Sequence, residues 1–516
     1  MWHMYINYLH EASLLNSLYQ TTVLEMSSLF AVVILQVSWQ CLVYANPEDR
    51  LLKRLLAVIL LQASLSHKSF THCNQEVHLE DGNSGPGEPL FLTPYLERGD
   101  VDWARRLARV SLFNHLHVES YAGFFTVDKT YGSNHLFWYF PSMSANRKND
   151  PVVVWLEGGP GTSGLINIFL GNGPVFVRNQ TFERREHHWA LSHHMIYIDS
   201  PVGTGFSFTK HPEGYCTNQT QVAEHLYSSL TQFFQLFPEL QQNEFFIAGE
   251  SYGGKYVPAL GYAIHKKNPT AKTKINLKGL AIGNGFTDPE NQLLYGKYLY
   301  QVGLIDFNER KIFEEYEGKT LSYIKHNKWR EAFDTFNILI ERFPGSYFNN
   351  FTGFDSYYKF IDPKVYFLPG FIEIDSALKK NDTRKGIHVG DLTFHNGSVV
   401  FNYLKQDIMK SVAPWLSELL DHYHCLIYSG QLDVIVAYPL TLNYLQKLNF
   451  SGSEEYRMAK RSIWRVDGEI AGYAKHGGRV VEVLVRNAGH AVPVDQPEWA
   501  LDMIQRFTHN TKCWDC

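Results

Sequence analysis

Residues 244–254 read Glu-Phe-Phe-Ile-Ala-Gly-Glu-Ser-Tyr-Gly-Gly, an apolar run that leads directly into a Gly-x-Ser-x-Gly motif. The apolar run is typical of a buried strand, and the glycines on either side of Ser251 permit a very tight turn into a helix. Such a turn exposes the serine hydroxyl and points the next backbone N–H, that of Tyr252, toward an incoming oxyanion. The stretch therefore predicts a strand, a sharp turn and a helix, with Ser251 as a nucleophile.

Strand-like and helix-like segments alternate on both sides of this motif. Short apolar runs that suit strands buried on both faces are residues 152–156, 195–199, 244–248, 275–282, 425–428 and 480–485. Two further runs, 121–128 and 135–140, flank a polar turn and predict an antiparallel hairpin. Apolar residues at helical spacing from Val222 to Phe237 predict a helix that Pro238 ends. This alternation predicts an α/β fold with a mostly parallel central sheet covered on both sides.

A serine hydroxyl is a weak nucleophile near neutral pH, so a base must take its proton. In the α/β-hydrolase fold, an acid and then a histidine follow the serine along the chain, each after a later strand. Asp433 lies in the loop after the predicted strand 425–428, and His490 closes Arg-Asn-Ala-Gly-His after strand 480–485. The order 251, 433, 490 predicts an α/β-hydrolase fold with a catalytic triad, and three unrelated loop residues are the alternative.

The loop after strand 152–156 reads Glu157-Gly-Gly-Pro-Gly161. An oxyanion hole needs a second backbone donor, from a loop after an early strand. We expect the N–H groups of Gly159 and Tyr252 to form it. A phosphate-binding loop would continue with Gly-Lys and then Ser or Thr, which this loop lacks.

Residues 290–395 break the alternation of strands and helices. A charged helical stretch from Asn308 to Ile340 precedes aromatic, loop-like sequence. We expect a helical lid or cap inserted between two parts of the core, residues 67–289 and 396–516, and a separate small domain is the alternative. Residues 1–66 contain short apolar segments and basic residues typical of a secretory signal, and we expect them to be removed or extraneous to the fold.

The composition restricts the class of protein. The 516 residues are 45% apolar and 19% charged with a formal net charge of −5, which permits a large core and argues against nucleic-acid binding. After the N-terminal segment no apolar run reaches about 18 residues, so we expect no membrane span in the mature chain. Histidine-rich spots at 187–188, 193–194 and 422–424 lack metal-site spacing and are expected to be exposed loops. We expect neither a metal nor a cofactor.

Asn-x-Ser/Thr sequons favour the secretory route. These candidate glycosylation sites are Asn179, Asn218, Asn350, Asn381, Asn396 and Asn449.

Together, these motifs resemble those of the serine carboxypeptidases, the family of carboxypeptidase Y and cathepsin A, and most closely its vitellogenic-like members. The motifs are Trp155-Leu-Glu-Gly-Gly-Pro-Gly161, Ile198-Asp-Ser-Pro-Val-Gly-Thr-Gly-Phe-Ser207, Gly249-Glu-Ser-Tyr-Gly-Gly254, Gly283-Asn-Gly285, Gly430-Gln-Leu-Asp433 and Gly489-His490. The resemblance runs from about residue 85 to near the C-terminus. It implies that single residues are removed from peptide C-termini through an acyl-enzyme. Ser251 would be the nucleophile, His490 the base and then the acid, and Asp433 the carboxylate that orients the imidazole.

The resemblance also implies a subsite for the free carboxylate of the substrate. The family makes it from an Asn after Trp-Leu, a Glu on the following helix and the Glu before the nucleophile. Here the first position holds Glu157, the second holds Gly171, and only Glu250 is retained. We expect Trp155, Glu157, Gly158 and Glu250 to form the subsite. Because two carboxyl groups in one site cannot both ionise easily, the two glutamates are predicted to share a proton and to confine activity to acidic pH.

Three functions remain open: an acid serine carboxypeptidase, an acyltransferase or esterase on the same scaffold, and a non-catalytic glycoprotein. Fold and triad cannot separate the first two because the pocket sets the function. The intact triad residues disfavour the third. We expect peptide or protein C-termini as substrates, a lysosomal or secreted location and no nucleic-acid partner, and we leave a homodimer open.

Overall fold

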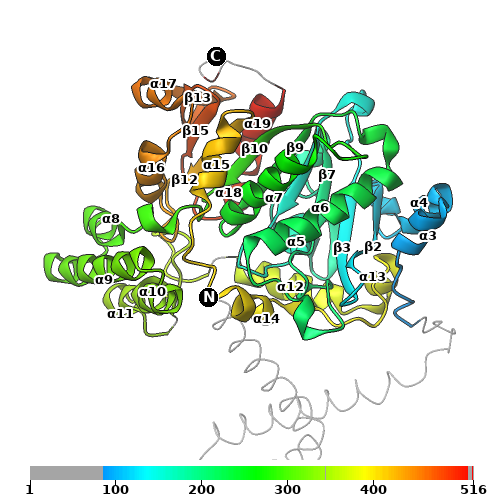
Figure 1. Ribbon diagram of the computed structural model, residues 1–516, viewed down its shortest axis with the longest axis horizontal. Helices are drawn as coiled ribbons and strands as arrows, with labels where there is room; N and C mark the ends of the chain where they lie inside the picture. The colour runs from blue at the N-terminus through cyan, green and yellow to red at the C-terminus, as the bar shows by residue number, and fades with distance from the viewer. Residues whose placement is uncertain (1–84, 343, 366, 510–513, 515–516) are drawn as a thin grey trace, which may run out of the picture. The chain divides into compact units, whose positions relative to one another are not determined.

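A central sheet organises the computed structural model, which describes residues 85–342, 344–365, 367–509 and 514 (Figure 1). Eleven strands of the described chain form this sheet. Their order across it is β1 (Arg109–Val110), β2 (Ser120–Asp128), β3 (Ser133–Phe140), β7 (His194–Ile198), β4 (Val152–Leu156), β9 (Phe245–Glu250), β10 (Leu277–Gly283), β12 (His424–Gly430), β15 (Val480–Val485), β14 (Glu469–Gly477) and β13 (Arg461–Val466). The expected secretory segment, residues 1–66, lies outside the described residues.

The six strands from β7 to β15 are mutually parallel, and each corresponds to one of the six predicted apolar runs. Their side chains are buried on both faces because helices cover both, as the two phenylalanines of β9 demonstrate. Phe245 packs on Phe234 of α6 (Gln219–Leu236), with ring centroids 5.7 Å apart. The next residue, Phe246, points to the other face and packs on Phe507 of α19 (Pro497–Thr508), 5.6 Å away. The predicted α/β-hydrolase sheet is confirmed.

Antiparallel strands extend the sheet at both edges. The predicted hairpin is β2 paired with β3, with Tyr121 opposite Tyr139 and a bulge between Thr126 and Asp128. At the other edge, β13 and β14 form a hairpin that our sequence interpretation missed. Asp467 and Gly468 form its turn with φ of 48° and 84°, and an Asp-Gly turn between alternating strands is a strong hairpin signal.

The helices of the core include the one predicted around Val222–Phe237. That helix, α6, ends at Leu236, and a 3₁₀ turn begins at Pro238. The remaining helices of the described core are α3 (Thr93–Arg98), α4 (Val101–Ala108), α5 (Gly164–Leu170), α7 (Gly253–Lys267), α14 (Ser398–Leu404), α15 (Ala413–Leu420), α16 (Tyr438–Lys447), α17 (Ser453–Met458) and α18 (Val492–Asp495). None of the helices in the described residues has both the length and the hydropathy of a membrane-spanning segment.

The segment inserted between β10 and β12 is largely helical. Its helices up to residue 386 are α8 (Tyr295–Gln301), α9 (Phe307–Lys325), α10 (Trp329–Phe336), the π-helical turn η7 (Asn337–Glu341), α11 (Tyr347–Thr352), α12 (Leu368–Leu378) and α13 (Asn381–Gly386). The predicted helical stretch from Asn308 to Ile340 is confirmed. The expectation of loop-like sequence beyond it is wrong for α11, α12 and α13. Local signals mark the start of two of these helices: the Ser346 hydroxyl accepts from Asn349 N at the start of α11, and Pro369 lies in the first turn of α12. No side-chain cap starts α13.

Three of the four histidines in the spots at 187–188 and 193–194 are buried, so the expectation that these spots form exposed loops is wrong for them. His188 and His193 have no exposed surface, and His194 retains 3%. Burial lowers the pKa of both His188 and His193 to about 3, so these rings are neutral structural groups. They flank the buried turn η3 (Trp189–Leu191) and the start of the central strand β7, positions that local sequence does not reveal. His422 and His424 are exposed, as expected.

Candidate active site

Ser251 lies in the turn between β9 and α7, as the sequence predicts. Its φ of 62° is in the left-handed region, which non-glycine residues seldom adopt and which is typical of a nucleophile turn. Hydrogen bonds fix this conformation: Ser251 N donates to Gly283 O at 3.0 Å, and Phe286 N donates to Ser251 O at 2.9 Å. A Cβ at Gly158 would lie 2.6 Å from Ser251 Cβ, so only glycine fits against the turn. This close approach brings the glycine-rich loop after β4 to the serine.

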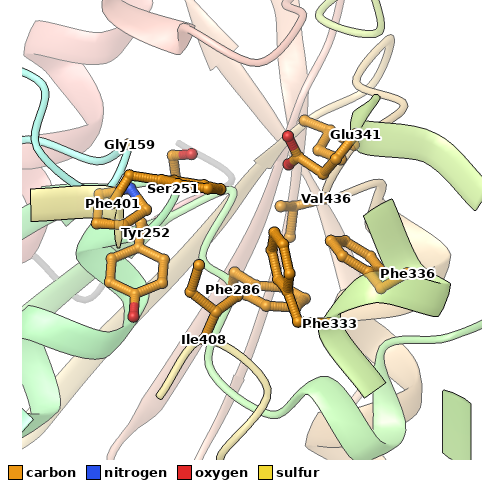
Figure 2. A pocket seen from close by; sticks show the side chains of 12 residues that line it. Gly159, Ser251, Tyr252, Phe286, Phe333, Phe336, Glu341, Phe401, Ile408 and Val436 are labelled. Atoms are coloured by element: carbon orange, nitrogen blue, oxygen red, sulfur yellow. The ribbon is translucent and has the colours of Figure 1, made fainter. Parts of the chain in front are cut away.

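The two predicted oxyanion donors lie on the same pocket as Ser251. Gly159 and Tyr252 both line this pocket beside the serine (Figure 2). Gly159 has φ of 111°, a conformation that only glycine adopts without strain. Neither backbone N–H donates a hydrogen bond to another described residue. Both donors are therefore available to an oxygen atom bound next to Ser251.

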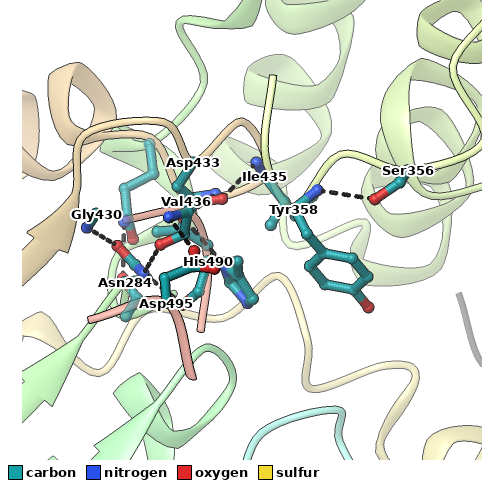
Figure 3. A network of polar contacts seen from close by, with 12 residues as sticks. Asn284, Ser356, Tyr358, Gly430, Asp433, Ile435, Val436, His490 and Asp495 are labelled. Atoms are coloured by element: carbon teal, nitrogen blue, oxygen red, sulfur yellow. Dashed lines mark hydrogen bonds and ion pairs between the residues drawn. The ribbon is translucent and has the colours of Figure 1, made fainter. Parts of the chain in front are cut away.

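Asp433 and His490 are hydrogen-bonded to each other (Figure 3). His490 Nδ1 lies 2.9 Å from Asp433 Oδ2, so the ring donates its Nδ1 proton to the carboxylate. Asp433 is fully buried and also accepts from Ile435 N at 3.1 Å and Val436 N at 3.3 Å. Burial raises the pKa of Asp433, while His490 and these N–H donors oppose the shift. The carboxylate is thereby oriented toward the imidazole.

Asn284 connects the turn at Ser251 with the loops that carry Asp433 and His490, a role that our sequence interpretation did not assign. It directly follows Gly283, which accepts from Ser251 N. Its side-chain Nδ2 donates to His490 O at 2.5 Å, and its Oδ1 accepts from Gly430 N at 2.8 Å at the end of β12. The motif Gly283-Asn-Gly285 after a predicted strand was the available signal. Asn284 bonds to the loops that carry Asp433 and His490 (Figure 3). The adjacent Gly283, which accepts from Ser251 N, extends this hydrogen-bonded unit to the turn at residue 251.

The inserted segment also holds the Asp433 and His490 loops. Tyr358 O accepts from His490 N at 2.7 Å, and the Tyr358 ring lies 5.3 Å from the imidazole, centroid to centroid. Tyr357 O accepts from Val434 N and Ile435 N, each at 3.2 Å. The insertion is therefore part of the scaffold that positions the histidine and its carboxylate.

Helix α8 supplies a second connection, which depends on a buried carboxyl group of α9. The hydroxyl of Tyr298 donates to Asp433 O at 2.9 Å, and that of Tyr295 donates to Ile435 O at 2.8 Å. At the start of α8, Gly296 N donates to Glu317 Oε1 at 2.8 Å. Burial raises the pKa of Glu317 from 4.5 to about 7.

Replacement of Glu317 by glutamine is expected to make stability less dependent on pH. A raised carboxyl pKa stabilises the fold fully below the unfolded value of 4.5, and this stabilisation is lost as pH rises to about 7. Glutamine cannot ionise. The free energy of unfolding of Glu317→Gln, relative to the wild type, should thus increase by about 3 kcal/mol between these pH values and then level off. Denaturant unfolding at pH 4.5, 6 and 7.5 measures it.

The matched control is Glu315→Gln, because Glu315 lies on the same helix with 61% of its side chain exposed. Its stability relative to the wild type should not change with pH. If the difference in unfolding free energy between Glu317→Gln and the wild type were also independent of pH, the pKa of Glu317 would not be raised.

The predicted carboxylate subsite contains two buried glutamates. Glu157 Oε2 accepts from Trp155 Nε1 at 2.9 Å and from Asn167 Nδ2 at 3.0 Å, and its Oε1 accepts from Gly158 N at 3.2 Å. The carboxyl of Glu250 accepts from the backbone of Val492, but its Oε2 is buried without a hydrogen-bond partner among the described residues. The predicted members Trp155, Glu157 and Gly158 are therefore directly connected, whereas Glu250 has a free buried oxygen.

The two glutamates are not equivalent electrostatically. Burial raises the pKa of Glu157, but the three N–H donors oppose the shift. Burial and the neighbouring charge of Glu157 together hold the pKa of Glu250 well above its usual range. The proton of the pair therefore belongs on Glu250, and Glu157 is the partner that N–H groups stabilise in the ionised form.

Asn167 on α5 is a member of this cluster that our sequence interpretation missed. A Cβ at Gly171 would lie 1.9 Å from Asn167 Oδ1, so the Asn167 amide fills the space that a side chain at position 171 would need. Four residues separate the two positions, which places them on one helix face. The family pattern has an Asn in the loop after β4 and a Glu on the following helix. Here the two are exchanged, because Glu157 lies in that loop and Asn167 lies on the helix. The missing side chain at Gly171 was the signal.

A mostly parallel sheet with a left-handed serine turn after one strand, and a His–Asp pair after two later strands, defines the α/β-hydrolase class. Within this class, the family model described as serine carboxypeptidase matches residues 112–510. Because the match spans most of the chain, the protein belongs to the serine carboxypeptidase family, whose members are exopeptidases.

Relatives and a solved structure agree with this assignment. The venom serine carboxypeptidase of Apis mellifera is 51% identical over 439 residues, 84% of this chain and 93% of the relative. The vitellogenic carboxypeptidase of Aedes aegypti is 51% identical over 429 residues, 82% of this chain and 90% of the relative. The prohormone-processing carboxypeptidase Kex1Δp of Saccharomyces cerevisiae has the same fold, with a TM-score of 0.67, 21% identity, and coverage of 79% of this chain and 96% of that one. The predicted resemblance to the vitellogenic-like group is confirmed.

Proposed function

We propose that this chain removes single residues from the free C-termini of peptides through an acyl-enzyme at Ser251. The observation that carries the proposal is the 2.9 Å His490–Asp433 hydrogen bond, which Asn284 joins to the left-handed turn at Ser251. In this scheme His490 accepts the Ser251 proton as the hydroxyl attacks the last peptide carbonyl, and Gly159 and Tyr252 N–H stabilise the oxyanion. His490 then protonates the leaving amine and activates the water that releases the shortened peptide.

An exopeptidase must also recognise the free carboxylate that internal peptide bonds lack. We assign this role to Glu250, supported by Trp155, Glu157, Gly158 and Asn167. In its neutral form Glu250 can donate a hydrogen bond from the buried carboxyl whose Oε2 has no partner in the described chain. Burial, and after it the negative charge of Glu157, keeps the pKa of Glu250 raised and so favours this neutral form.

This arrangement predicts that recognition weakens as pH rises. A carboxyl group with a raised pKa is protonated at low pH and loses its proton as pH approaches that pKa. The ionised Glu250 would then repel the substrate carboxylate. KM for peptide acids should therefore increase with pH, whereas KM for the matching peptide amides should not. Rates for both series from pH 4 to pH 8 provide the measurement.

Substitutions at position 250 distinguish this explanation from titration of the triad. Glutamine remains a donor at every pH, so Glu250→Gln should retain the preference for peptide acids and lose its dependence on pH. Glu250→Ala should reduce the preference about ten- to a hundredfold, the usual cost of losing a hydrogen bond to a charged group. The same rise of KM in Glu250→Gln would contradict the proposal.

Digestion of a peptide library, with and without C-terminal amides, tests the function as a whole. We expect stepwise loss of residues from free C-termini, read by mass, with the highest efficiency at acidic pH. Cleavage of esters without trimming of any peptide would instead support the esterase or acyltransferase alternative.

We further propose that residues 290–395 form a lid over the substrate pocket. Phe333, Phe336 and Glu341, all from this insertion, line the pocket that also contains Ser251. The lid would thus provide specificity, while the core provides the triad.

The secretory route and a lysosomal or secreted location also remain proposals. The relative from Apis mellifera is a venom protein by name. Asn179, Asn350, Asn381 and Asn449 are exposed, and Asn218 and Asn396 are partly exposed, so no sequon is buried in the core. Treatment of the secreted protein with a glycosidase, followed by mass measurement, tests the six glycosylation sites.

A further inference from the structure

The pocket beside Ser251 has a mostly aromatic and aliphatic lining with a single carboxylate (Figure 2). The pocket is open to solvent and lies directly beside the Ser251 hydroxyl. Phe286, Phe333 and Phe336 form much of the apolar wall, and the Phe286 and Phe336 rings stack with centroids 5.5 Å apart. Glu341 is the acidic member of this lining.

The pocket lies on the acyl side of the scissile bond. Its lining includes the oxyanion donors Gly159 and Tyr252, but not the carboxylate-binding Glu157 or Glu250. Ser251 therefore separates the pocket from the carboxylate subsite. In the proposed reaction the last residue of the peptide occupies that subsite, so the side chain of the penultimate residue enters the pocket.

Glu341 is held so that it faces this space. It ends the π-helical turn η7, and the Tyr357 hydroxyl donates to its Oε2 at 3.0 Å. Figure 2 shows its carboxylate oxygens on the side toward Ser251. A carboxylate has about four acceptor positions, so Glu341 can accept from a substrate cation in addition to its partners within the protein, of which Tyr357 is one.

The rest of the pocket suits a long cationic side chain. Aromatic faces attract cations, and lysine and arginine pack their aliphatic stems on apolar walls. Two lysines of the protein contact rings of this wall: Lys405 Nζ lies 5.0 Å from the Phe333 ring centroid and is paired with Asp334, and the buried Lys255 Nζ lies 5.7 Å from the Phe286 ring centroid. Burial lowers the pKa of Lys255 to about 8, and the neighbouring charge of Asp407 opposes this shift.

We propose that Glu341 makes the enzyme prefer peptides whose penultimate residue is lysine or arginine. This selectivity rests on the proposed carboxypeptidase function and adds a substrate class to it. The pairing is charge-assisted and partly desolvated by the aromatic wall, so it should act mainly through KM.

Kinetics on a peptide series that differs only at the penultimate residue test this proposal. The series contains lysine, arginine, norleucine and glutamate at that position. For the wild type we expect kcat/KM for lysine and arginine to exceed that for norleucine about tenfold or more, with glutamate the poorest. In Glu341→Gln the ratio of lysine to norleucine should fall to about one, while norleucine peptides keep their rate.

Two controls separate the possible outcomes. Glu331→Gln alters an exposed glutamate of α10 and should leave every ratio unchanged. In a second peptide series that varies only the last residue, the ratios of kcat/KM should be the same for the wild type and for Glu341→Gln. If the wild type trims peptides without a preference for lysine, or if Glu341→Gln keeps that preference, the inference about Glu341 is wrong. If no peptide is trimmed at all, the proposed function itself fails.

Discussion

Replacement of Ser251 by alanine is expected to lower kcat by about a millionfold, the cost of removing a nucleophile that acts as a unit with its base. The oxyanion donors of Gly159 and Tyr252 and the carboxylate subsite remain in the variant, so peptides should still bind. Single-turnover kinetics at saturating peptide measure the rate, and calorimetric titration of a peptide acid measures the affinity. We expect an affinity within a few-fold of the KM of the wild type.

The variant is expected to fold normally. Alanine carries a Cβ like serine, so the left-handed φ of 62° costs both residues a similar amount. The hydrogen bonds from Ser251 N and to Ser251 O involve backbone atoms and survive the change. Ser322→Ala, at an exposed position of α9, is the matched control and should keep full activity. A residual kcat above about one thousandth of the wild-type value would show that a different residue is the nucleophile.

The central sheet was predictable because its strands are buried on both faces. A run such as Val152–Leu156 is continuously apolar, and no amphipathic alternative competes with that reading. Residue 482 illustrates the limit of this rule, because a glutamate is buried within β15. The hydroxyl of Tyr438 donates to its carboxylate at 2.5 Å, and the hydroxyl of Tyr456 donates as well. The sequence around Glu482 does not reveal these hydrogen bonds, because their donors come from segments distant in the chain.

The edges of the fold were less predictable. Strands β13 and β14 carry mixed polar and apolar residues because one side of the hairpin faces solvent. The Asp467-Gly468 turn was their only sharp local signal. The buried ring of His193 depends on a partner far away in sequence, Thr508, whose hydroxyl lies 2.7 Å from His193 Nε2.

Some residues of the candidate site were predictable from the sequence, and others were not. The positions of Ser251, Asp433 and His490 follow from strand ends that meet at one edge of a parallel sheet, so order along the chain was sufficient. Asn284 and Tyr358 act through contacts with His490 more than 130 residues away, as the separations of 206 and 132 residues indicate. No local pattern specifies such contacts.

Replacement of Asp433 by asparagine should reduce kcat by about ten-thousandfold with little change in KM. In the wild type, Asp433 Oδ2 accepts from His490 Nδ1 at 2.9 Å, and Oδ1 accepts from Ile435 N at 3.1 Å. Asparagine has only one oxygen. With its NH₂ toward the ring, the imidazole must carry its proton on Nε2 and can no longer take the proton of Ser251.

The opposite orientation of the amide does not rescue the enzyme. It keeps an oxygen toward His490 but places the NH₂ against the Ile435 N–H, which lies 3.1 Å from Asp433 Oδ1, a buried clash between two donors that costs about 1–3 kcal/mol. The first orientation meets only the more distant Val436 N–H, which lies 3.3 Å from Asp433 Oδ2. The amide should therefore turn toward the ring, and the rate at which a fluorophosphonate labels Ser251 should fall in parallel with kcat. Asp391→Asn, at an exposed position, is the control and should change neither rate. If Asp433→Asn kept both rates within tenfold of the wild type, the buried carboxylate would not be the group that sets the tautomer of His490.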